Sequence, residues 1–447
     1  MLLLLNNRKD KIVNNFDWKE IWENVFLIES DGYGVIYSPL QGIIFAVTKE
    51  GILELGTYLK KEDYLGLYNS ILKERGIPKE NSNPVGRIPR RFASSELNMG
   101  ITYECNLACI GCYAKAGEES RRLSWEKIQI AIDKLVEYVQ ELNEDSAYIG
   151  FNSTGETTLR WEILERAVNY ARSVFPENIK LQFSLTTNAC LLNIERVKFL
   201  KEKNFFVRVS MDGLKSSHNR QRPKKNGGGS FDDVVKGIKE LVKQNVWFSI
   251  RTTITGYNQG EMPEFAKFLY KLGCKDVVVV PFSAVGRASS GITPVNPEIF
   301  IKKYIDAYKI AQQIGFSFSM PGVSLEEIDV NYCLADGNIF AVMPDGSITS
   351  CTRVTKQGDL LSEIFVIGEI DDGRVKIDQK KVDKLGQLNL NNYPECQYCF
   401  AKFSCSGGCP HERFSGSWDK EAHCKMVRSI LWYKLLEITG QEQYYTN

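Results

Sequence analysis

The pattern of hydrophobic and polar positions is most regular in the centre of the chain. Short apolar runs typical of strands alternate there with stretches whose apolar residues recur every three or four positions, as in amphipathic helices. Six βα-type repeats require a parallel sheet with right-handed crossovers, which fits a partial (β/α)6 barrel in an α/β protein. Strands are predicted at 97–102, 147–151, 180–185, 205–210, 247–254 and 276–280, and helices at 125–142, 161–173, 194–203, 232–243, 262–272 and 297–313.

The flanking regions have different patterns. Residues 1–82 combine short strands at 25–29, 34–36 and 43–47 with a helix at 63–75, which predicts a small α+β domain, and a polar linker follows at 83–94. The barrel is assigned to 95–315 and an irregular cysteine-rich domain to 316–447. In that last domain, Pro344-Asp345-Gly346 between two apolar runs predicts a hairpin, and a closing helix is predicted at 425–439.

Composition narrows the classes of function. A chain of 447 residues predicts more than one domain, and a net charge of +1 gives no case for nucleic acid or an anionic membrane as partner. The apolar run 2–5 is too short for a signal peptide and no segment is predicted to span a bilayer, so we expect a cytoplasmic protein. In a reducing compartment, 12 cysteines indicate metal binding rather than disulfides, and only three histidines argue against imidazole-rich sites.

Three cysteines follow the first predicted barrel strand. Cys105, Cys109 and Cys112 have the spacing C-x3-C-x2-C, and loops at strand carboxyl ends carry the chemistry of parallel barrels. Three thiolates can hold three corners of an iron–sulfur cube, leaving the fourth iron open to a ligand because no fourth cysteine lies in this run. A zinc site is the alternative interpretation.

Seven of the other nine cysteines form a second ordered pattern. A zinc knuckle that includes His411 or His423 is again the alternative for part of this set. The remaining two, Cys190 and Cys274, are predicted to be small apolar residues without a metal. The seven cysteines of the pattern are Cys333, Cys351, Cys396, Cys399, Cys405, Cys409 and Cys424.

The first motif resembles the signature of the radical S-adenosylmethionine (SAM) enzymes, and the seven-cysteine pattern resembles the SPASM domain of their peptide-modifying members. The resemblance implies SAM and three 4Fe–4S clusters, one of which binds SAM and cleaves it to a 5′-deoxyadenosyl radical. It assigns Cys333, Cys351 and Cys409 to one auxiliary cluster and the other four SPASM cysteines to the second. The first auxiliary cluster is then one ligand short, and a substrate cysteine is a hypothetical fourth ligand.

Further segments resemble the SAM-binding motifs of the family, with departures. Gly155-Glu156 resembles part of the Gly-Gly-Glu-Pro loop that holds the SAM amino group, although Thr154 and Thr157 replace the flanking glycine and proline. Thr187-Asn188 resembles the Thr-Asn-Gly segment near the ribose, with Ala189 in place of glycine.

Two other parts of the expected SAM site follow from the resemblance. By this resemblance, Ser210 and Arg222 are expected to bind the SAM carboxylate and ribose. A guanidinium group binds a carboxylate well because it can donate two parallel hydrogen bonds to it. Gly111 stands where the family usually has an aromatic residue near the adenine, and Tyr113 is a candidate to fill that gap. Asp212 is a candidate general base, although aspartate in this motif is more often structural.

The resemblance implies a maturase that forms a thioether or carbon–carbon cross-link in a ribosomally made peptide. Residues 1–82 are a candidate element for recognising a leader peptide by strand addition, and a flavodoxin- or ferredoxin-like protein is the expected electron donor. One alternative is an anaerobic sulfatase-type maturase that makes formylglycine, although its proposed Asp base is replaced here by Thr352. The other alternative is a non-catalytic, zinc-stabilised scaffold that binds peptides.

Overall fold

The structure is a computed structural model that describes residues 16–30, 33–84, 91–152, 154–289, 291–441 and 445. The apolar run 2–5, Ser153 of the Gly-Glu loop and residues 85–90 of the predicted linker lie outside this part of the chain.

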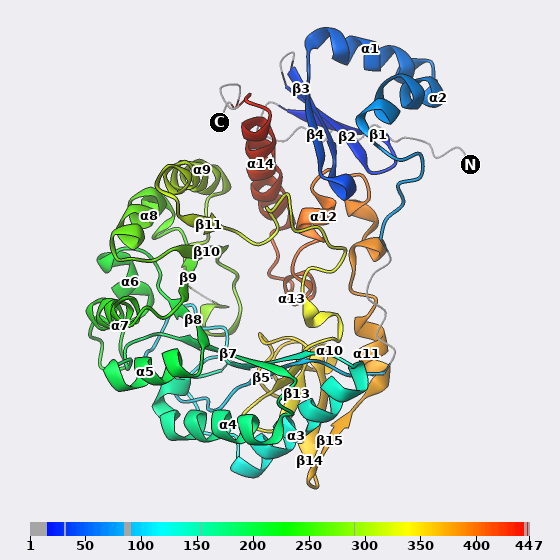
Figure 1. Ribbon diagram of the computed structural model, residues 1–447. Helices are drawn as coiled ribbons and strands as arrows, with labels where there is room; N and C mark the ends of the chain where they lie inside the picture. Colours follow the sequence, from blue (N-terminus) through cyan, green and yellow to red (C-terminus); the bar gives the residue numbers. More distant parts are fainter. Residues whose placement is uncertain are drawn as a thin grey trace.

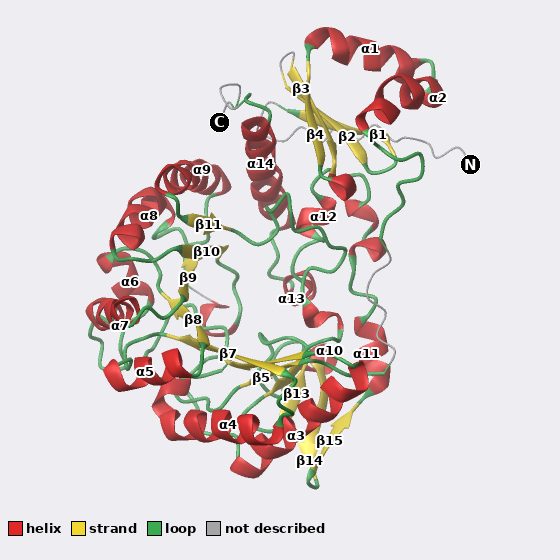
Figure 2. Cartoon of the chain, in the orientation of Figure 1, coloured by secondary structure: helices red, strands yellow, loops and turns green. Residues whose placement is uncertain are grey.

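The predicted parallel sheet forms the centre of the molecule (Figures 1 and 2). Its strands are hydrogen-bonded in chain order, each parallel to the next, which confirms the α/β fold with a partial (β/α)6 barrel. The short strand β11 was not predicted and extends one edge of the sheet. The strands are β5 (Glu96–Met99), β6 (Ser146–Phe151), β7 (Lys180–Thr187), β8 (Phe205–Ser210), β9 (Phe248–Ile254), β10 (Asp276–Pro281) and β11 (Ser317–Ser319).

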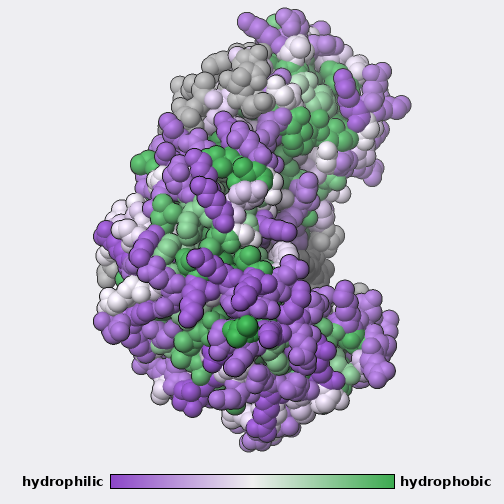
Figure 3. Space-filling model, turned by 60° about the vertical axis from the view of Figure 1, so that its left-hand side comes forward, coloured by the Kyte–Doolittle hydropathy of each residue, from purple (hydrophilic) through white to green (hydrophobic). Residues whose placement is uncertain are grey.

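Amphipathic helices cover the outer face of this sheet, and their solvent-facing side is mostly hydrophilic (Figure 3). Asn296 caps α9, because its side chain accepts a hydrogen bond from the Ile299 amide. Only α6, inserted between β8 and α7, was not predicted. The helices are α3 (Trp125–Leu142), α4 (Trp161–Val174), α5 (Ile194–Glu202), α6 (Lys215–Gln221), α7 (Phe231–Lys243), α8 (Met262–Lys271) and α9 (Pro297–Ile314).

The amino-terminal region has an antiparallel sheet and a hydrophobic core of its own. The sheet contains the three predicted strands and one further edge strand, β1, and two helices follow it. The predicted helix at 63–75 is α2 with an irregular continuation to Arg75, whereas α1 was not predicted. The elements are β1 (Asp17–Trp22), β2 (Val25–Ser30), β3 (Tyr33–Ser38), β4 (Ile43–Val47), α1 (Lys49–Lys60) and α2 (Tyr64–Leu67).

The cysteine-rich region is joined to the barrel by its sheet. The predicted hairpin is formed by β12 (Phe340–Val342) and β13 (Ser347–Thr349), and β12 also pairs in parallel with β5. Two more strands, β14 (Val366–Asp371) and β15 (Arg374–Ile377), extend this edge of the sheet. The hairpin therefore brings the cysteine-rich region beside the barrel strand that precedes the cysteine triad.

Short helices and one long helix complete the chain. The last helix, α14, begins at Lys420, five residues before its predicted start, because the Asp419 side chain caps it by accepting from the Ala422 amide. It packs against α9, between the barrel and the amino-terminal region (Figure 1). In the described part of the chain, no helix has the length and apolar content of a membrane span. The short helices are α10 (Ser362–Phe365), α11 (Gln379–Leu385), α12 (Lys402–Cys405) and α13 (Pro410–Ser415).

Candidate active site

A cavity of about 450 Å³ opens at the carboxyl ends of the barrel strands. Its wall contains every residue that the sequence assigned to the triad, the SAM contacts and the candidate base. Successive strands supply an inner row of polar side chains, because alternate residues of a strand face the same side. That row consists of Asn98, Asn152, Thr186, Arg208 and Arg251.

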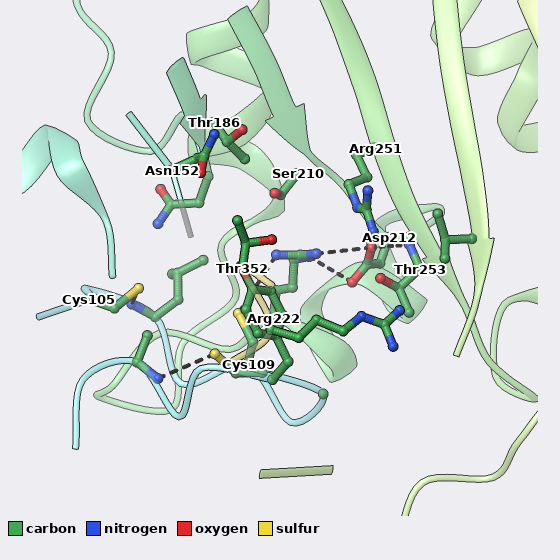
Figure 4. Close-up of a pocket in the computed structure, with 18 of the residues that line it drawn as sticks. Cys105, Cys109, Asn152, Thr186, Ser210, Asp212, Arg222, Arg251, Thr253 and Thr352 are labelled. Carbon is green, nitrogen blue, oxygen red and sulfur yellow. Dashed lines mark hydrogen bonds and ion pairs between the residues drawn. The ribbon is translucent and has the colours of Figure 1, made fainter. Parts of the chain in front are cut away.

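The three triad sulfurs each face a nitrogen donor. The Leu107 amide lies 3.4 Å from Cys105 Sγ, and the Ala116 amide lies 3.3 Å from Cys112 Sγ. Cys109 Sγ lies 3.9 Å from Arg222 Nη1 (Figure 4). Such donors stabilise thiolates and tune iron–sulfur clusters, so the donor set fits a 4Fe–4S cluster.

Burial opposes ionisation of the Cys105 and Cys109 thiols in the absence of metal. It raises the pKa of Cys105 to about 12 and that of Cys109 to about 11, with the nearby Glu156 adding to the first and Arg222 opposing the second. Because iron binds the thiolate form, metal binding must supply the free energy that deprotonates them.

Arg287 holds the triad loop in place. Its Nη1 donates to the Cys109 carbonyl at 2.8 Å and its Nη2 to the Ala116 carbonyl at 2.7 Å. Its backbone amide donates to the Cys112 carbonyl at 2.9 Å. Gly286 adopts a φ of 67°, and a Cβ there would lie 2.2 Å from the Tyr113 carbonyl oxygen. No sequence pattern indicates this contact, since the segment after β10 has no regular period.

The Gly155-Glu156 loop packs directly on the triad loop. The Gly155 amide donates to the Thr102 carbonyl at 2.8 Å, and the Glu156 amide donates to the Glu104 carbonyl at 2.8 Å. A Cβ at Gly155 would lie 2.1 Å from the Glu104 carbonyl oxygen, so only glycine fits.

The Glu156 carboxylate is buried and joins two loops. It accepts hydrogen bonds at 2.7 Å from the Asn188 amide and from the Thr187 hydroxyl, and it also accepts from Thr158. The loops after β6 and β7 are therefore held together by the two motifs that the resemblance placed at the SAM amino group and ribose.

Asp212 forms a two-pronged ion pair with Arg222. Its Oδ2 accepts from Arg222 Nε at 2.7 Å and its Oδ1 from Nη2 at 3.2 Å (Figure 4). It also accepts from the Thr253 amide at 2.8 Å. Burial alone would lower the pKa of Arg222, but Asp212 and Cys109 outweigh it and raise the pKa. Asp212, the candidate base, therefore orients Arg222 through this ion pair.

A buried histidine supports this pair. The Asp212 amide donates to His218 Nδ1 at 3.2 Å, and His218 Nε2 lies 3.0 Å from the Ser230 hydroxyl. Burial and the positive charge of Arg222 lower the pKa of His218 to about 4, so the imidazole is neutral near pH 7 and can accept at Nδ1.

An aromatic side chain fills the space beside Gly111. A Cβ at this glycine would lie 3.7 Å from the Phe282 ring, which follows β10, and Tyr113 is 38% exposed in the same cavity. Phe282 is therefore a second aromatic residue in the region where the family motif has one. Sequence reasoning missed it because 171 residues separate it from Gly111.

The seven SPASM cysteines fall into two groups. Burial raises the pKa of Cys351 to about 12, and the neighbouring thiolates of Cys409 and Cys333 add to this effect. Burial also raises the pKa of Cys405, with additions from Cys399, Cys424 and Cys396. These neighbours are the partners that the resemblance implied for the two auxiliary clusters. The pairing of cysteines is thus compatible with the implied ligand sets.

Basic side chains surround the second group. Arg428 Nε lies 3.3 Å from Cys399 Sγ, and Arg413 Nη2 lies 3.5 Å from Cys396 Sγ. His423 Nε2 lies 3.3 Å from Cys405 Sγ, whereas His411 stacks on Phe365. Among the described residues, no three His, Cys, Asp or Glu side chains are arranged to hold a single metal ion.

The first group adjoins the cavity. Thr352 and Arg353, which follow Cys351, line the same cavity as the triad (Figure 4). Arg353 Nη1 is paired with Glu412 at 2.8 Å. Outside both groups, Cys274 is 1% exposed and donates to the Asp276 carbonyl, as expected of a buried apolar residue, and Cys190 is half-buried.

Comparison with known proteins identifies the family of the barrel region. Residues 99–269 match the family model described as the radical SAM superfamily. An uncharacterized protein of Methanocaldococcus jannaschii is 33% identical over 181 residues, which span 40% of this chain and 60% of that protein. A cysteine-type anaerobic sulfatase-maturating enzyme of Clostridium perfringens is 26% identical over 328 residues, which span 68% of this chain and 85% of that enzyme.

A solved structure shows the same fold. Native anSMEcpe with bound AdoMet and Cp18Cys peptide superposes with a TM-score of 0.62 and 20% identity, and the match covers 77% of this chain and 98% of that one. The chain therefore contains a radical SAM domain. Its named relatives include the Clostridium perfringens maturase, and the match to the radical SAM superfamily confirms the class of enzyme that the spacing of the triad predicts.

Proposed function

We propose that this protein is a radical SAM maturase that forms a thioether or carbon–carbon cross-link in a peptide. The observation that carries the proposal is that one cavity is lined both by the triad and by Thr352 and Arg353, the residues next to Cys351. A substrate in that cavity would lie between the source of the radical and the first auxiliary cysteine group.

The residues have separate roles in this proposal. Cys105, Cys109 and Cys112 would hold a 4Fe–4S cluster, which together with SAM supplies a 5′-deoxyadenosyl radical. Ser210 and Arg222 would bind the SAM carboxylate and ribose, with Asp212 fixing the guanidinium. The Gly155-Glu156 loop contributes acceptor oxygens near the amino group, because both of its amide donors are already used.

The auxiliary cysteines would remove the surplus electron. Cross-linking takes two hydrogen atoms from the peptide: one as the atom abstracted by the radical, the other as a proton and an electron. The proton passes to solvent. Cys333, Cys351 and Cys409 would hold one auxiliary cluster and the other four cysteines the second, and these clusters would supply acceptor sites for that electron. A flavodoxin- or ferredoxin-like protein would donate the electron that SAM cleavage consumes.

The amino-terminal domain is the proposed leader-binding element. Its sheet ends in β4, whose outer side has no strand partner among the described residues, and a peptide can add there through main-chain hydrogen bonds.

Formylglycine formation is the second candidate, favoured by the name of the Clostridium perfringens relative. Among the residues that the structure describes, the cavity wall contains only two carboxylates, Glu156 and Asp212, and both are held by hydrogen bonds within the protein. Thr352 occupies the cavity position where that alternative expects an aspartate base. These contacts favour a cross-linking reaction.

Mass spectrometry tests the proposal. The reconstituted enzyme is incubated without oxygen with SAM, a reductant and the small peptide encoded beside its gene. Loss of two hydrogens, mapped between two side chains, is expected. Replacement of a cysteine or serine side chain by an aldehyde would support the sulfatase-type alternative, and a peptide left unmodified while 5′-deoxyadenosine forms would contradict this choice of substrate.

A further inference from the structure

Two arginines on adjacent barrel strands face the cavity and have no acidic partner in the part of the chain that the structure describes. Arg208 lies on β8 and Arg251 on β9, where the strand register places Arg251 opposite Ser210. Arg208 is two residues before Ser210, so the three side chains point to the same side of the sheet. Both arginines line the cavity.

The remaining charges of the cavity are already paired. Arg222 is held by Asp212, Arg353 by Glu412, and the oxygens of Glu156 accept from protein donors. Among the described residues, Arg208 and Arg251 form no ion pair, and Arg208 Nε is buried without a hydrogen-bond partner. The cavity therefore holds two guanidinium groups that no protein carboxylate neutralises.

Arg251 shares its cavity with parts of both metal-binding regions. Its side chain is exposed to this cavity, which is also lined by Tyr113, next to Cys112, and by Thr352, next to Cys351. An anion bound to Arg251 would thus lie in the cavity that the triad shares with the residue next to Cys351.

We propose that Arg208 and Arg251 bind a carboxylate of the peptide substrate and thereby position the residue that is modified. This inference rests on the proposed function and names its substrate class, a peptide with a carboxylate at or beside the reacting residue. A guanidinium matches a carboxylate through two parallel hydrogen bonds, and the partly enclosed cavity strengthens that interaction. The carboxylate comes from an Asp or Glu side chain or from the peptide carboxyl terminus.

Calorimetry with short synthetic peptides tests this proposal. The probes are Ac-Gly-Glu-Gly-NH2, with a side-chain carboxylate, Ac-Gly-Gln-Gly-OH, with a terminal carboxylate, and the neutral Ac-Gly-Gln-Gly-NH2. Each is titrated into the reconstituted holoenzyme saturated with SAM. At least one carboxylate peptide should bind about 10- to 100-fold more tightly than the neutral one. The peptide that binds more tightly identifies the source of the carboxylate.

Variants connect the preference to these side chains. Arg208→Gln and Arg251→Gln should each remove most of the preference, Arg251→Lys should restore part of it, and Arg374→Gln, at an exposed position on β15, should retain it. Equal binding of all three peptides to the unaltered enzyme would overturn the proposal. Loss of SAM affinity in the two glutamine variants would also overturn it, because the arginines would then belong to the SAM site.

A separate measurement distinguishes failure of the binding proposal from failure of the proposed radical function. Formation of 5′-deoxyadenosine by the same enzyme preparations reports SAM cleavage independently of peptide binding. A carboxylate preference without SAM cleavage would support the binding site while contradicting radical chemistry. SAM cleavage without a carboxylate preference would support radical chemistry and contradict the carboxylate-binding site.

Discussion

At the residue scale, the site depends on side chains that orient one another. Arg222 reaches toward Cys109 and is fixed by both oxygens of Asp212, and the Asp212 amide is in turn held by His218. An aspartate in this position acts through the arginine and is therefore a positioning residue.

The variant Asp212→Asn tests that role. It keeps the shape of the side chain but removes the charge, so SAM should bind about tenfold more weakly. The pH profile of turnover at saturating SAM should stay as in the unaltered enzyme, since no proton transfer is lost. A profile that loses its acidic limb, with SAM affinity retained, would instead identify Asp212 as the general base.

The aromatic residue beside Gly111 gives a second prediction. Replacing Phe282 by Ala removes the ring next to this glycine and should raise the Kd for SAM by about 2- to 10-fold, the worth of one aromatic contact. Equilibrium dialysis with labelled SAM measures the effect, with Phe414→Ala on an exposed helix as the control. An unchanged Kd would show that Phe282 does not contact the ligand.

Spacing within a short segment could be read from the sequence, whereas contacts across the barrel could not. The triad and the SPASM cysteines are recognised by their separations along the chain. Arg208, Arg251 and Phe282 stand in ordinary strand or loop contexts, and only the order and register of the strands bring them to one cavity. No local pattern distinguishes such residues from other charged or apolar positions.

At the element scale, the loops after β5 and β6 pack so closely that one glycine is required. The variant Gly155→Ala would place a methyl group 2.1 Å from the Glu104 carbonyl oxygen and 2.5 Å from that of Thr102. It should destabilise the fold by roughly 1–3 kcal/mol, as overpacking does, and lower iron content after reconstitution.

A matched glycine supplies the control for this prediction. Gly56 lies inside α1 and has no neighbouring atom within 4 Å of an added Cβ, so Gly56→Ala should stabilise the protein slightly, by about 1 kcal/mol or less. Urea unfolding measures both changes in free energy. Equal behaviour of the two variants would contradict the close packing of the two loops.

The elements of the barrel were predictable because their hydrophobic period is regular. The strand β1 was missed because two charged residues, Lys19 and Glu20, break the alternation of its apolar positions at the edge of the sheet. The helix α1 was missed because two glycines interrupt its pattern. The pairing of β12 with β5 joins segments more than 240 residues apart. No sequence feature of either strand predicts this pairing.

At the scale of the whole molecule, the sheet carries the cysteine-rich region onto the barrel and gives one chain three groups of cysteines. Three 4Fe–4S clusters require about 12 iron atoms per chain. Cys351→Ala and Cys399→Ala, one from each SPASM group, should each lower the iron content by about 4. Cys190→Ala, outside every group, should leave it unchanged. Iron and zinc analysis of the reconstituted proteins measures this, and zinc in place of iron would support a structural scaffold.

The formation of 5′-deoxyadenosine tests the central claim most directly. The reconstituted enzyme is mixed without oxygen with SAM and dithionite, and the product is quantified by liquid chromatography and mass spectrometry beside the variant Cys112→Ala. Radical SAM chemistry at the triad predicts that the unaltered enzyme forms 5′-deoxyadenosine and that the variant forms none. Iron-loaded enzyme that forms no 5′-deoxyadenosine, or a variant as active as the unaltered protein, would contradict that chemistry.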